Sequence, residues 1–489
     1  MRKIVSILFL ITVTVFTFSC RKDSIDTNSS VTLNFSTDTL LFDTVFATFG
    51  STTHRLKIYN PSNSTVNISS ISVGNGANSQ FRINVDGISG NIHTDIEIGG
   101  KDSLFIFAEV TIDPNNVLSP FVVTDQINFV TNGNSQNVAL VAWGQNAHYY
   151  VANTTANGIP VVYLDRGTSP GALDSTWVND KPYVIYGGYL TLDGDDKLTI
   201  DPGVQVHLHN NSGIWVYEDG NIIVNGTQTD PVVFQGTRLE FAWQDISGQW
   251  DRLWINENTN GIDNVFNYAI IKNAFIGIQA ETNPFNPLPP ISPNTLRLNN
   301  CEIQNSSAVG ILAKNYKITD TNSVISNSGQ YNFLAQGDGD YQFNHTTFVN
   351  YWDESTRQTP SIFLQNAYVN INGATVVSNL TAANFYNCII DGDQEIEFDA
   401  NEVSGGTINF LLDYCILKTT TTLSGPNYIN VITSPSTPIF LDKALKDYHL
   451  DPASPAINAG NNTSGVGFDH DGNSRSDGAP DIGAYEKQP

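Results

Sequence analysis

Between residues 182 and 236 the sequence consists of short apolar, β-branched runs, and each run is closed by Gly, Asn, Asp or Pro. Examples are residues 198–200, 204–206, 214–216 and 222–224. Val and Ile suit a pleated surface, while Gly and Asn supply corners with positive φ. No run is long enough, or periodic enough at 3.6 residues, to form a helix. The pattern therefore predicts short strands joined by tight corners.

The same pattern returns at intervals of roughly 20 to 30 residues, the range in which one supersecondary unit stacks on the next. A β-solenoid is the simplest interpretation of such a repeat. Each coil contributes short strands to parallel sheets, and inward side chains stack on those of the neighbouring coils. The repeat predicts an all-β solenoid over residues 148–445.

Particular stretches of this repeat resemble a known family. The run LTIDPGV at 198–204, then VNGT at 224–227 and PVVF at 231–234, is similar to the early coils of right-handed parallel β-helix proteins of the pectin-lyase-like superfamily. The resemblance implies a right-handed parallel β-helix. Because that fold is shared by lyases, glycosidases, adhesins and scaffolds, it implies architecture more than chemistry.

The first residues have the pattern of an export signal and are not expected to be part of the fold. Residues 1–19 combine a basic start with an apolar stretch too short to span a bilayer, which predicts a signal peptide, and Cys20 resembles the lipidated Cys of bacterial lipoproteins. The alternative is an ordinary signal peptide with an incidental Cys. Residues 20–30 form a tether, and Arg21-Lys22-Asp23 partly resembles export signals of surface lipoproteins of Bacteroidetes. We expect a lipid-anchored outer-membrane protein, on the periplasmic face or the cell surface.

Residues 31–147 read differently, with longer alternating strands separated by turns. About seven strands over some 110 residues are typical of an immunoglobulin-like sandwich. Similar small domains of exported bacterial proteins act as spacers. We expect this domain to be a stalk, with glycan or protein binding as the alternative.

Charge and cysteine content exclude some functions. The chain has 23 Lys and Arg against 48 Asp and Glu, which gives a net charge of −25. This charge argues against nucleic acid and anionic membrane surfaces as partners. It argues more weakly against polyanionic glycans, unless calcium bridges the charges. Cys301, Cys388 and Cys415 share one local pattern, which predicts small buried thiols at equivalent positions of different coils. We expect a monomer.

The final stretch, residues 446–489, carries four motifs in order: DYHL, SPAINAG, DHDGNSR and GAPDIGAYE. Together they resemble the C-terminal segment of exported β-helix proteins called choice-of-anchor Q. A solenoid needs its last coil covered, because an open parallel edge invites further pairing. We expect this segment to form that coil and its cap.

Within this segment Asp469, Asp471 and Asn473 have the alternating spacing of calcium loops, which places three oxygen ligands on one side of a turn. The Gly and Glu of an EF-hand are absent at the corresponding positions. The alternative is an Asx-turn cluster with Arg475 paired to a neighbouring Asp. Calcium is therefore the one cofactor that the sequence suggests.

Few residues point to catalysis. Asp391 and Asp393 lie in an acidic turn that could supply carboxylates, and Lys272 could supply a base, although a solvated turn is the commoner role of such a cluster. Tyr351 and Trp352 lie in a predicted loop and are candidates for stacking on sugar rings.

The sequence favours a cell-envelope scaffold or binding module without enzymatic activity. An elongated sheet face suits an elongated polymer, so carbohydrate is the expected ligand. One alternative is a polysaccharide lyase or glycoside hydrolase of the pectin-lyase-like fold, for which carboxylates and a cation should converge on one face. The other is an adhesin or envelope-assembly protein, which should show a large exposed apolar patch.

Overall fold

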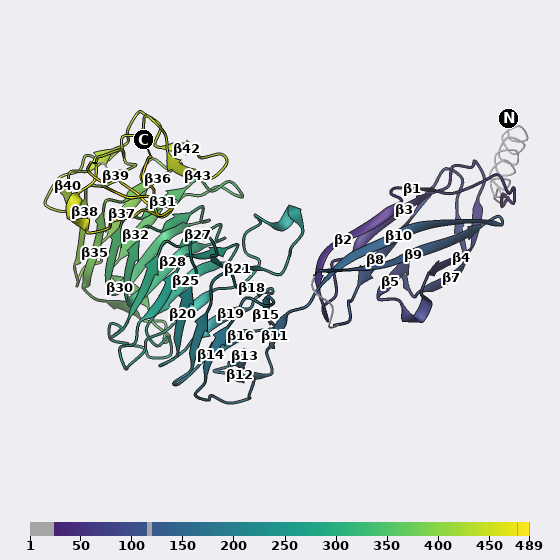
Figure 1. Cartoon of the computed structure of the whole chain (residues 1–489), viewed down its shortest axis with the longest axis horizontal. Coiled ribbons are helices and arrows are strands. Elements are labelled where there is room, and N and C mark those ends of the chain that lie inside the picture. Colours follow the sequence, from purple (N-terminus) through teal and green to yellow (C-terminus); the bar gives the residue numbers. More distant parts are fainter. Residues whose placement is uncertain (1–23, 115–119, 477, 489) are drawn as a thin grey trace, which may run out of the picture. The chain divides into compact units, whose positions relative to one another are not determined.

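A computed structural model describes residues 24–114, 120–476 and 478–488 of the chain. The chain divides into two compact units, with the division between Asn146 and Ala147 (Figure 1). The predicted signal peptide and Cys20 lie outside the described residues. Within the described ranges, no helix has the length and apolar character that a bilayer crossing requires.

The first unit is a β-sandwich of two five-stranded sheets. One sheet has the order β1 (Asn34–Phe35), β3 (His54–Tyr59), β8 (Ser103–Val110), β5 (Phe81–Val85) and β6 (Ile88–Ser89). The other has the order β2 (Thr39–Phe46), β10 (Asn134–Gln145), β9 (Phe121–Thr131), β4 (Val66–Val73) and β7 (Ile92–Ile98), and the single-turn helix η1 (Gly76–Asn78) follows β4. Apolar side chains of both sheets form one core, which is what alternating strands produce. The finer expectation, an immunoglobulin-like topology, stays a prediction.

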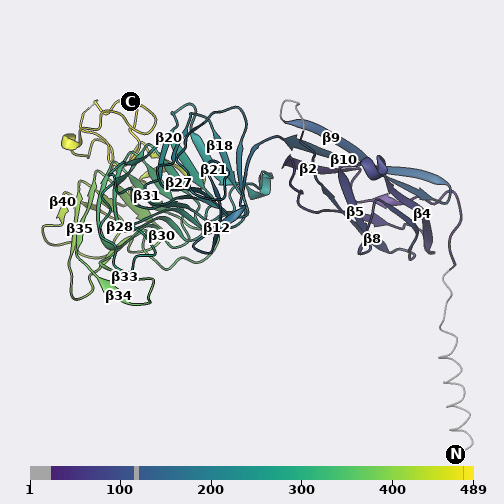
Figure 2. The same ribbon diagram turned by 90° about the horizontal axis from the view of Figure 1, so that it is seen from below.

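The second unit is a parallel solenoid, whose strands lie side by side along its axis in Figure 1 and are seen from below in Figure 2. Its first sheet has eleven strands, all paired in parallel: β11 (His148–Val151), β15 (Tyr183–Tyr186), β18 (Gln205–Leu208), β21 (Val232–Gly236), β24 (Ala269–Lys272), β27 (Glu302–Gln304), β29 (Val324–Ser326), β31 (Thr347–Asn350), β36 (Ile389–Gly392), β39 (Ile416–Leu417) and β41 (Ile432–Thr433).

The second sheet has eighteen strands in two parallel ladders, with β12 (Thr154–Ala156) as an antiparallel start. The first ladder contains β13 (Ile159–Tyr163), β16 (Tyr189–Leu192), β19 (Gly213–Val216), β22 (Leu253–Ile255), β25 (Ile276–Glu281), β28 (Val309–Thr321), β30 (Tyr331–Asn344), β32 (Ile362–Gln365) and β37 (Phe398–Asn401). The second contains β14 (Asp174–Trp177), β17 (Lys197–Ile200), β20 (Asn221–Asn225), β23 (Asn264–Asn267), β26 (Thr295–Asn299), β35 (Leu380–Tyr386), β38 (Ile408–Asp413) and β40 (Tyr428–Ile429), and β28 and β30 run through both.

Successive strands along the chain enter the eleven-stranded sheet, then the first ladder, then the second ladder. This order confirms the predicted all-β class and the parallel β-helix. Side chains that point inward from the eleven-stranded sheet and from both ladders of the second sheet form one continuous core along the axis. Each buried Val, Ile, Leu or Phe side chain stabilises the fold by about 1.5–3 kcal/mol relative to its exposure.

The three cysteines are part of this core and are fully buried. Burial raises the pKa of Cys301 to about 12 and raises that of Cys388 well above its usual range. A thiol that stays protonated is a poor nucleophile. The cysteines therefore act as small apolar side chains, as their shared pattern predicts.

Asparagines hold the corners of the solenoid. Asn300, Asn322 and Asn387 precede strands of the eleven-stranded sheet, and all three have φ between 50° and 56°. Asn tolerates this left-handed region better than other residues with a Cβ. The Asn322 side chain donates to Asn300 Oδ1 at 3.2 Å, and Asn305 donates to Asn273 Oδ1 at 2.8 Å. Stacked amides thus connect neighbouring coils.

The C-terminal segment, residues 434–476 and 478–488, contains the hairpin β42 (Phe440–Asp442) and β43 (Asp447–Leu450) and the short helix η3 (Asn462–Ser464). It packs on the outer face of the eleven-stranded sheet, where Val349 and Ile389 join its Tyr448 and Ile482 in one apolar cluster. A hydrogen bond of 2.9 Å from Ala484 N–H to Thr347 Oγ1 fixes it there. We expected residues 446–489 to form the last coil and its cap; the described residues of this range pack on the side of several coils instead, because the outward positions of those coils are apolar.

Two smaller features complete the second unit. The helix η2 (Phe241–Trp243) precedes β22, and the hairpin β33 (Ala367–Val369) and β34 (Thr375–Val377) lies between β32 and β35. The proline-rich residues 282–294 form no strand and connect β25 to β26. Phe285 of this loop packs on Trp215 and Tyr217 of the outer face. The loop therefore lies back against the solenoid.

Candidate functional site

The first ladder ends at β37, and a cavity opens beside this last strand. β37 pairs with β32, whereas residues 418–427, which follow β39, form no strand that would continue the ladder. The resulting cavity of about 680 Å³, here called the end cavity, is open to solvent. Its lining comes from four chain segments: Gln358, Thr359, Pro360, Gln394, Glu395, Ile396, Phe398, Asp399, Ala400, Phe410, Leu417, Thr419, Thr421, Leu423 and Tyr428.

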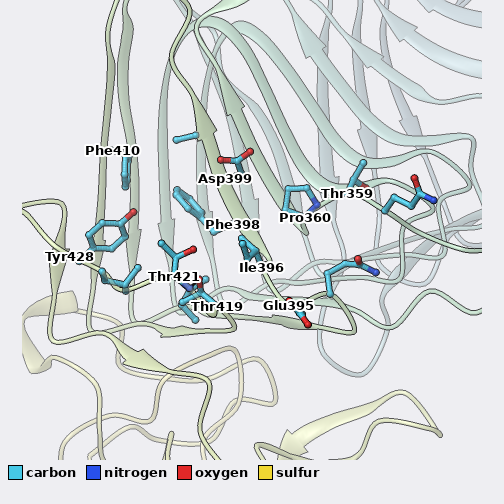
Figure 3. A pocket seen from close by; sticks show the side chains of 15 residues that line it. Thr359, Pro360, Glu395, Ile396, Phe398, Asp399, Phe410, Thr419, Thr421 and Tyr428 are labelled. Carbon is cyan, nitrogen blue, oxygen red and sulfur yellow. Dashed lines mark hydrogen bonds between the residues drawn. The ribbon is translucent and has the colours of Figure 1, made fainter.

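Aromatic side chains form one side of the end cavity. Phe410 and Tyr428 lie at that side in Figure 3, while Thr359 and Glu395 lie at the other, with Phe398 between them. The ring centroids of Phe398 and Phe410 are 5.3 Å apart, and those of Phe410 and Tyr428 are 5.6 Å apart. Phe410 and Tyr428 are half-buried, because no further coil covers this end of the core. They offer ring surface to a ligand.

Two carboxylates share the end cavity with these rings. Glu395 and Asp399 are both exposed, and neither has a hydrogen-bond or ion-pair partner among the described residues. Burial, and then the nearby Asp399 carboxylate, raise the pKa of Tyr428. Asp399 and Tyr428 line the same cavity. Gln358, Gln394 and the threonines add hydrogen-bonding groups to the same lining.

An ion pair connects the two loops that form the wall of the end cavity. Arg357 lies in the loop before β32, and Glu397 lies in the turn before β37. Arg357 donates from Nη1 to Glu397 Oε2 at 2.8 Å and from Nη2 to Oε1 at 2.5 Å, and both side chains are fully buried. Glu397 also accepts from the N–H of Ser361 at 2.7 Å and of Gln394 at 2.8 Å. The turn that carries Glu395 is therefore fixed from both sides.

The residues that the sequence suggested for catalysis are not brought together as a catalytic set. Asp391 is 8% exposed and accepts a hydrogen bond from the Tyr351 hydroxyl, while Asp393 pairs with Arg357. Lys272 ends β24, which lies four strands from β36 in the eleven-stranded sheet, about 19 Å at 4.7–4.9 Å per strand. Lys272 is thus too distant to act with either carboxylate.

The two predicted carbohydrate-binding residues differ in their surroundings. Trp352 is 7% exposed and donates from Nε1 to Ser355 Oγ at 2.9 Å, so its ring offers little surface for stacking. Tyr351 lines a second cavity of about 640 Å³, together with Asp391, Lys418 and residues 434–444. Lys443 lies over the Tyr351 ring, with its Nζ 4.8 Å from the ring centroid.

Another polar cluster lies on the outer face of the first ladder. Glu281 is 1% exposed, accepts from Trp254 Nε1 at 2.8 Å and forms an ion pair with Lys314. The carboxylate is therefore enclosed by its partners. It resembles the converging carboxylate and cation that we expected of an enzyme, but its burial leaves no space for a substrate.

The suggested calcium ligands make protein contacts. Asp469 is 1% exposed, and its carboxylate accepts from the Asn473 N–H at 2.6 Å, from Asn473 Nδ2 at 3.1 Å and from the Glu486 N–H at 2.7 Å. Asp471 accepts from His449 at 2.8 Å. Among the residues with described positions, no group of three or more His, Cys, Asp or Glu side chains has the arrangement of a metal site. Calcium and an Asx-turn cluster remain the two alternatives for these residues.

Sequence reasoning missed most of the end cavity. Glu395 follows the acidic turn of Asp391 and Asp393 that the sequence highlights, but Asp399, Phe410 and Tyr428 lie within strands and do not differ from ordinary residues of a coil in the sequence. The signal that could have found them is the end of the repeat after β37. The last coil exposes side chains that a further coil would cover.

Comparisons with known proteins give no family for this chain. No family model matches it, and no curated protein matches it. Among solved structures, it is similar to the catalytic domain of a GH87 alpha-1,3-glucanase in complex with nigerose, at 11% identity and a TM-score of 0.21, covering 78% of this chain and 87% of that one.

Two shorter likenesses involve about a quarter of the chain. One is to a family 123 glycoside hydrolase from Clostridium perfringens, at 7% identity, a TM-score of 0.18 and coverage of 24%, which spans 30% of that enzyme. The other is to a protein of unknown function from Porphyromonas gingivalis W83, at 13% identity, a TM-score of 0.17 and coverage of 27% of this chain and 57% of that one. These TM-scores are low, and the fold of this chain is established by its own strand pairing.

Proposed function

We propose that the second unit is a carbohydrate-active module that holds a glycan chain in the end cavity and hydrolyses its glycosidic bond. The observation that carries the proposal is the joint presence of partly exposed rings and two exposed carboxylates in one open cavity. Tyr428 and Phe410 stack on the apolar face of a sugar ring, and amide and hydroxyl groups bind its hydroxyls.

Glu395 and Asp399 supply the chemistry in this proposal. Glycoside hydrolysis uses one carboxylic acid to protonate the leaving oxygen and one carboxylate as base or nucleophile. Both side chains line the end cavity without partners among the described residues, so they are free to contact a substrate. The Arg357–Glu397 ion pair holds the turn that carries Glu395, and Arg357 is thus a positioning residue.

The experiment incubates the purified protein with a panel of α- and β-glucans, xylan, mannan and polygalacturonate and measures new reducing ends. We expect cleavage of at least one polymer, and a loss of 10²- to 10⁴-fold in Glu395→Gln and in Asp399→Asn, the range for removal of a general acid or base. Asp353→Asn, an exposed carboxylate outside the cavity lining, is the matched control and should keep full activity. Cleavage that persists in both cavity variants would refute the assignment.

A second candidate is binding without cleavage. It is favoured by one observation: no described side chain donates to or pairs with Glu395 or Asp399, whereas catalytic carboxylates are usually held by neighbours. In this case the polymer is retained and no new ends form. Tyr428→Ala should then weaken retention, while Glu395→Gln should have little effect.

A lipid-anchored position in the outer membrane completes the proposal. It follows from the resemblance of Cys20 and the preceding residues to a lipoprotein signal. Metabolic labelling with a fatty acid tests it, because Cys20→Ser should abolish the label.

A further inference from the structure

The outer face of one sheet of the first unit carries a row of aromatic side chains. In β8, Phe105 and Phe107 point outward and are 39% and 42% exposed, while Ile106 and Ala108 between and beside them point into the core. Tyr59 at the end of β3 is 39% exposed on the same face. Outward positions of a sheet that faces solvent are usually polar. Three exposed rings on one face therefore call for a partner.

The rings are arranged as a platform. The ring centroids of Phe105 and Phe107 are 6.4 Å apart with an interplanar angle of 23°, as expected for residues two positions apart on one strand. The Nζ of Lys57 lies 5.2 Å from the Phe105 centroid and 5.1 Å from the Tyr59 centroid. Aromatic surface and positive charge are thus interleaved on this face.

Cations flank the platform on both sides. Arg55 and Lys57 of β3 are in register with Phe107 and Phe105, and Arg82 of β5 lies on the opposite side. Glu109 is the one acidic side chain among the outward positions of β3, β5 and β8. The chain as a whole has a net charge of −25, but on these three strands three cations face one carboxylate, and charges farther away than the Debye length of about 8 Å are largely screened at physiological salt.

A hollow adjoins the platform at one end. This cavity of about 630 Å³ is lined by Phe107, Arg82, Asn84 and Glu109 together with the glycines of the turn around β6. The hollow thus combines one ring, one guanidinium group and an amide beside the Glu109 carboxylate, and the first three are groups that bind sugar rings bearing acidic substituents. A protein partner would require a broader apolar area than three rings separated by cations.

We propose that this face of the first unit, β3, β8 and β5 with the adjoining hollow, binds an acidic polysaccharide. Sugar rings stack on Phe105 and Phe107, and carboxylate or sulfate groups pair with Arg55, Lys57 and Arg82. The site is separate from the end cavity, because every residue that forms it belongs to the first unit.

The experiment titrates the full protein with polygalacturonate, chondroitin sulfate and neutral dextran and measures Kd by calorimetry. We expect binding to at least one of the two acidic polymers, and any binding of dextran, an α-glucan like those tested on the end cavity, should be unchanged in Phe105→Ala/Phe107→Ala. Phe105→Ala/Phe107→Ala should weaken that binding at least tenfold, as should Arg55→Ser/Lys57→Ser. The control Leu41→Ala/Val122→Ala changes exposed apolar side chains of the other sheet and should bind as the parent protein does.

A thermal unfolding curve like that of the parent protein verifies that each variant is folded. The variant Glu395→Gln/Asp399→Asn should retain the same affinity, which separates this site from the end cavity. Binding of neither acidic polymer, binding of dextran that Phe105→Ala/Phe107→Ala weakens to the same extent, or unchanged affinity for the acidic polymers in both platform variants would overturn the proposal. So would self-association of the parent protein that Phe105→Ala/Phe107→Ala abolishes, because a second copy would then be the occupant.

Discussion

Arg357 and Glu397 form a two-point ion pair in which neither side chain is exposed to solvent. Removing one partner of such a pair leaves an uncompensated buried charge, which costs about 3–5 kcal/mol, whereas replacing both by apolar residues is often neutral. We therefore expect Arg357→Met to destabilise the second unit by that amount. The double variant Arg357→Met/Glu397→Met should recover part of the loss, because it removes the unpaired charge but leaves the N–H groups of Ser361 and Gln394 without their acceptor.

Urea unfolding of the three proteins measures this difference. Equal destabilisation of the single and double variants would mean that the pair itself, and not the unpaired charge, provides the stability.

The double variant also tests whether the ion pair positions the turn that carries Glu395. It should remain folded but lose the activity or binding assigned to the end cavity, because the turn that carries Glu395 is no longer fixed.

The C-terminal segment should be sensitive to alkaline pH. His449 lies between Asp471 and Asp447, and hydrogen bonds to these carboxylates, that to Asp471 first, raise the pKa of His449 to about 9. This value lies above the unfolded pKa of about 6.5. The stabilisation is thus complete below about pH 6.5 and is lost as the pH rises through 9.

Thermal unfolding of the second unit between pH 6 and 10 tests this expectation. The apparent Tm should fall over that range in the parent protein and fall less in His449→Gln. His148→Gln is the matched control, because His148 lies at the start of the solenoid in β11. An identical pH dependence in His449→Gln and the parent protein would contradict the assignment.

Calcium should have little effect on stability. The Asp469 carboxylate already accepts three N–H donors, so a cation would have to displace them. We expect the same Tm in calcium and in EDTA. A rise in Tm with calcium that Asp469→Asn abolishes would show instead that the turn 469–473 is a metal site, as the spacing of its oxygen ligands suggests.

Each corner asparagine should contribute to the stability of the fold in two separable ways, through its backbone conformation and through its side-chain hydrogen bonds. Asn305 has φ of 59°, and its side chain donates to Asn273 and to the Asp245 carbonyl. Both Asn305→Gly and Asn305→Ala lose the side-chain hydrogen bonds. Asn305→Gly has no Cβ and is relaxed in the left-handed region, while Asn305→Ala keeps a Cβ there, which costs about 1–3 kcal/mol. We expect Asn305→Ala to be less stable than Asn305→Gly in denaturant unfolding. The reverse order would mean that the backbone is not strained there.

Much of the architecture could be predicted because it is repeated. The β-branched runs, the corner asparagines and the three cysteines each recur at equivalent positions of different coils, so the same local pattern can be recognised many times. The placement of the C-terminal segment could not be predicted in the same way. Its apolar partners, Val349 and Ile389, alternate with core residues, and their sequence alone does not show which chain segment covers them.

The end cavity could not be predicted from the sequence for a related reason. It exists because the first ladder stops at β37, and the position of the last coil depends on how the irregular residues 418–427 fold. In the sequence Asp391 and Asp393 form an acidic turn. In the structure Asp391 accepts a hydrogen bond from Tyr351, and Asp393 forms an ion pair with Arg357. Sequence shows charges but not which partner they find.

The most direct test is a crystal structure of Glu395→Gln/Asp399→Asn grown with an oligosaccharide of the polymer that the protein cleaves or retains. The proposed function predicts a sugar ring stacked on Tyr428 or Phe410, with its glycosidic oxygen beside residues 395 and 399. An oligosaccharide bound elsewhere on the solenoid, with the end cavity free of sugar, would contradict it.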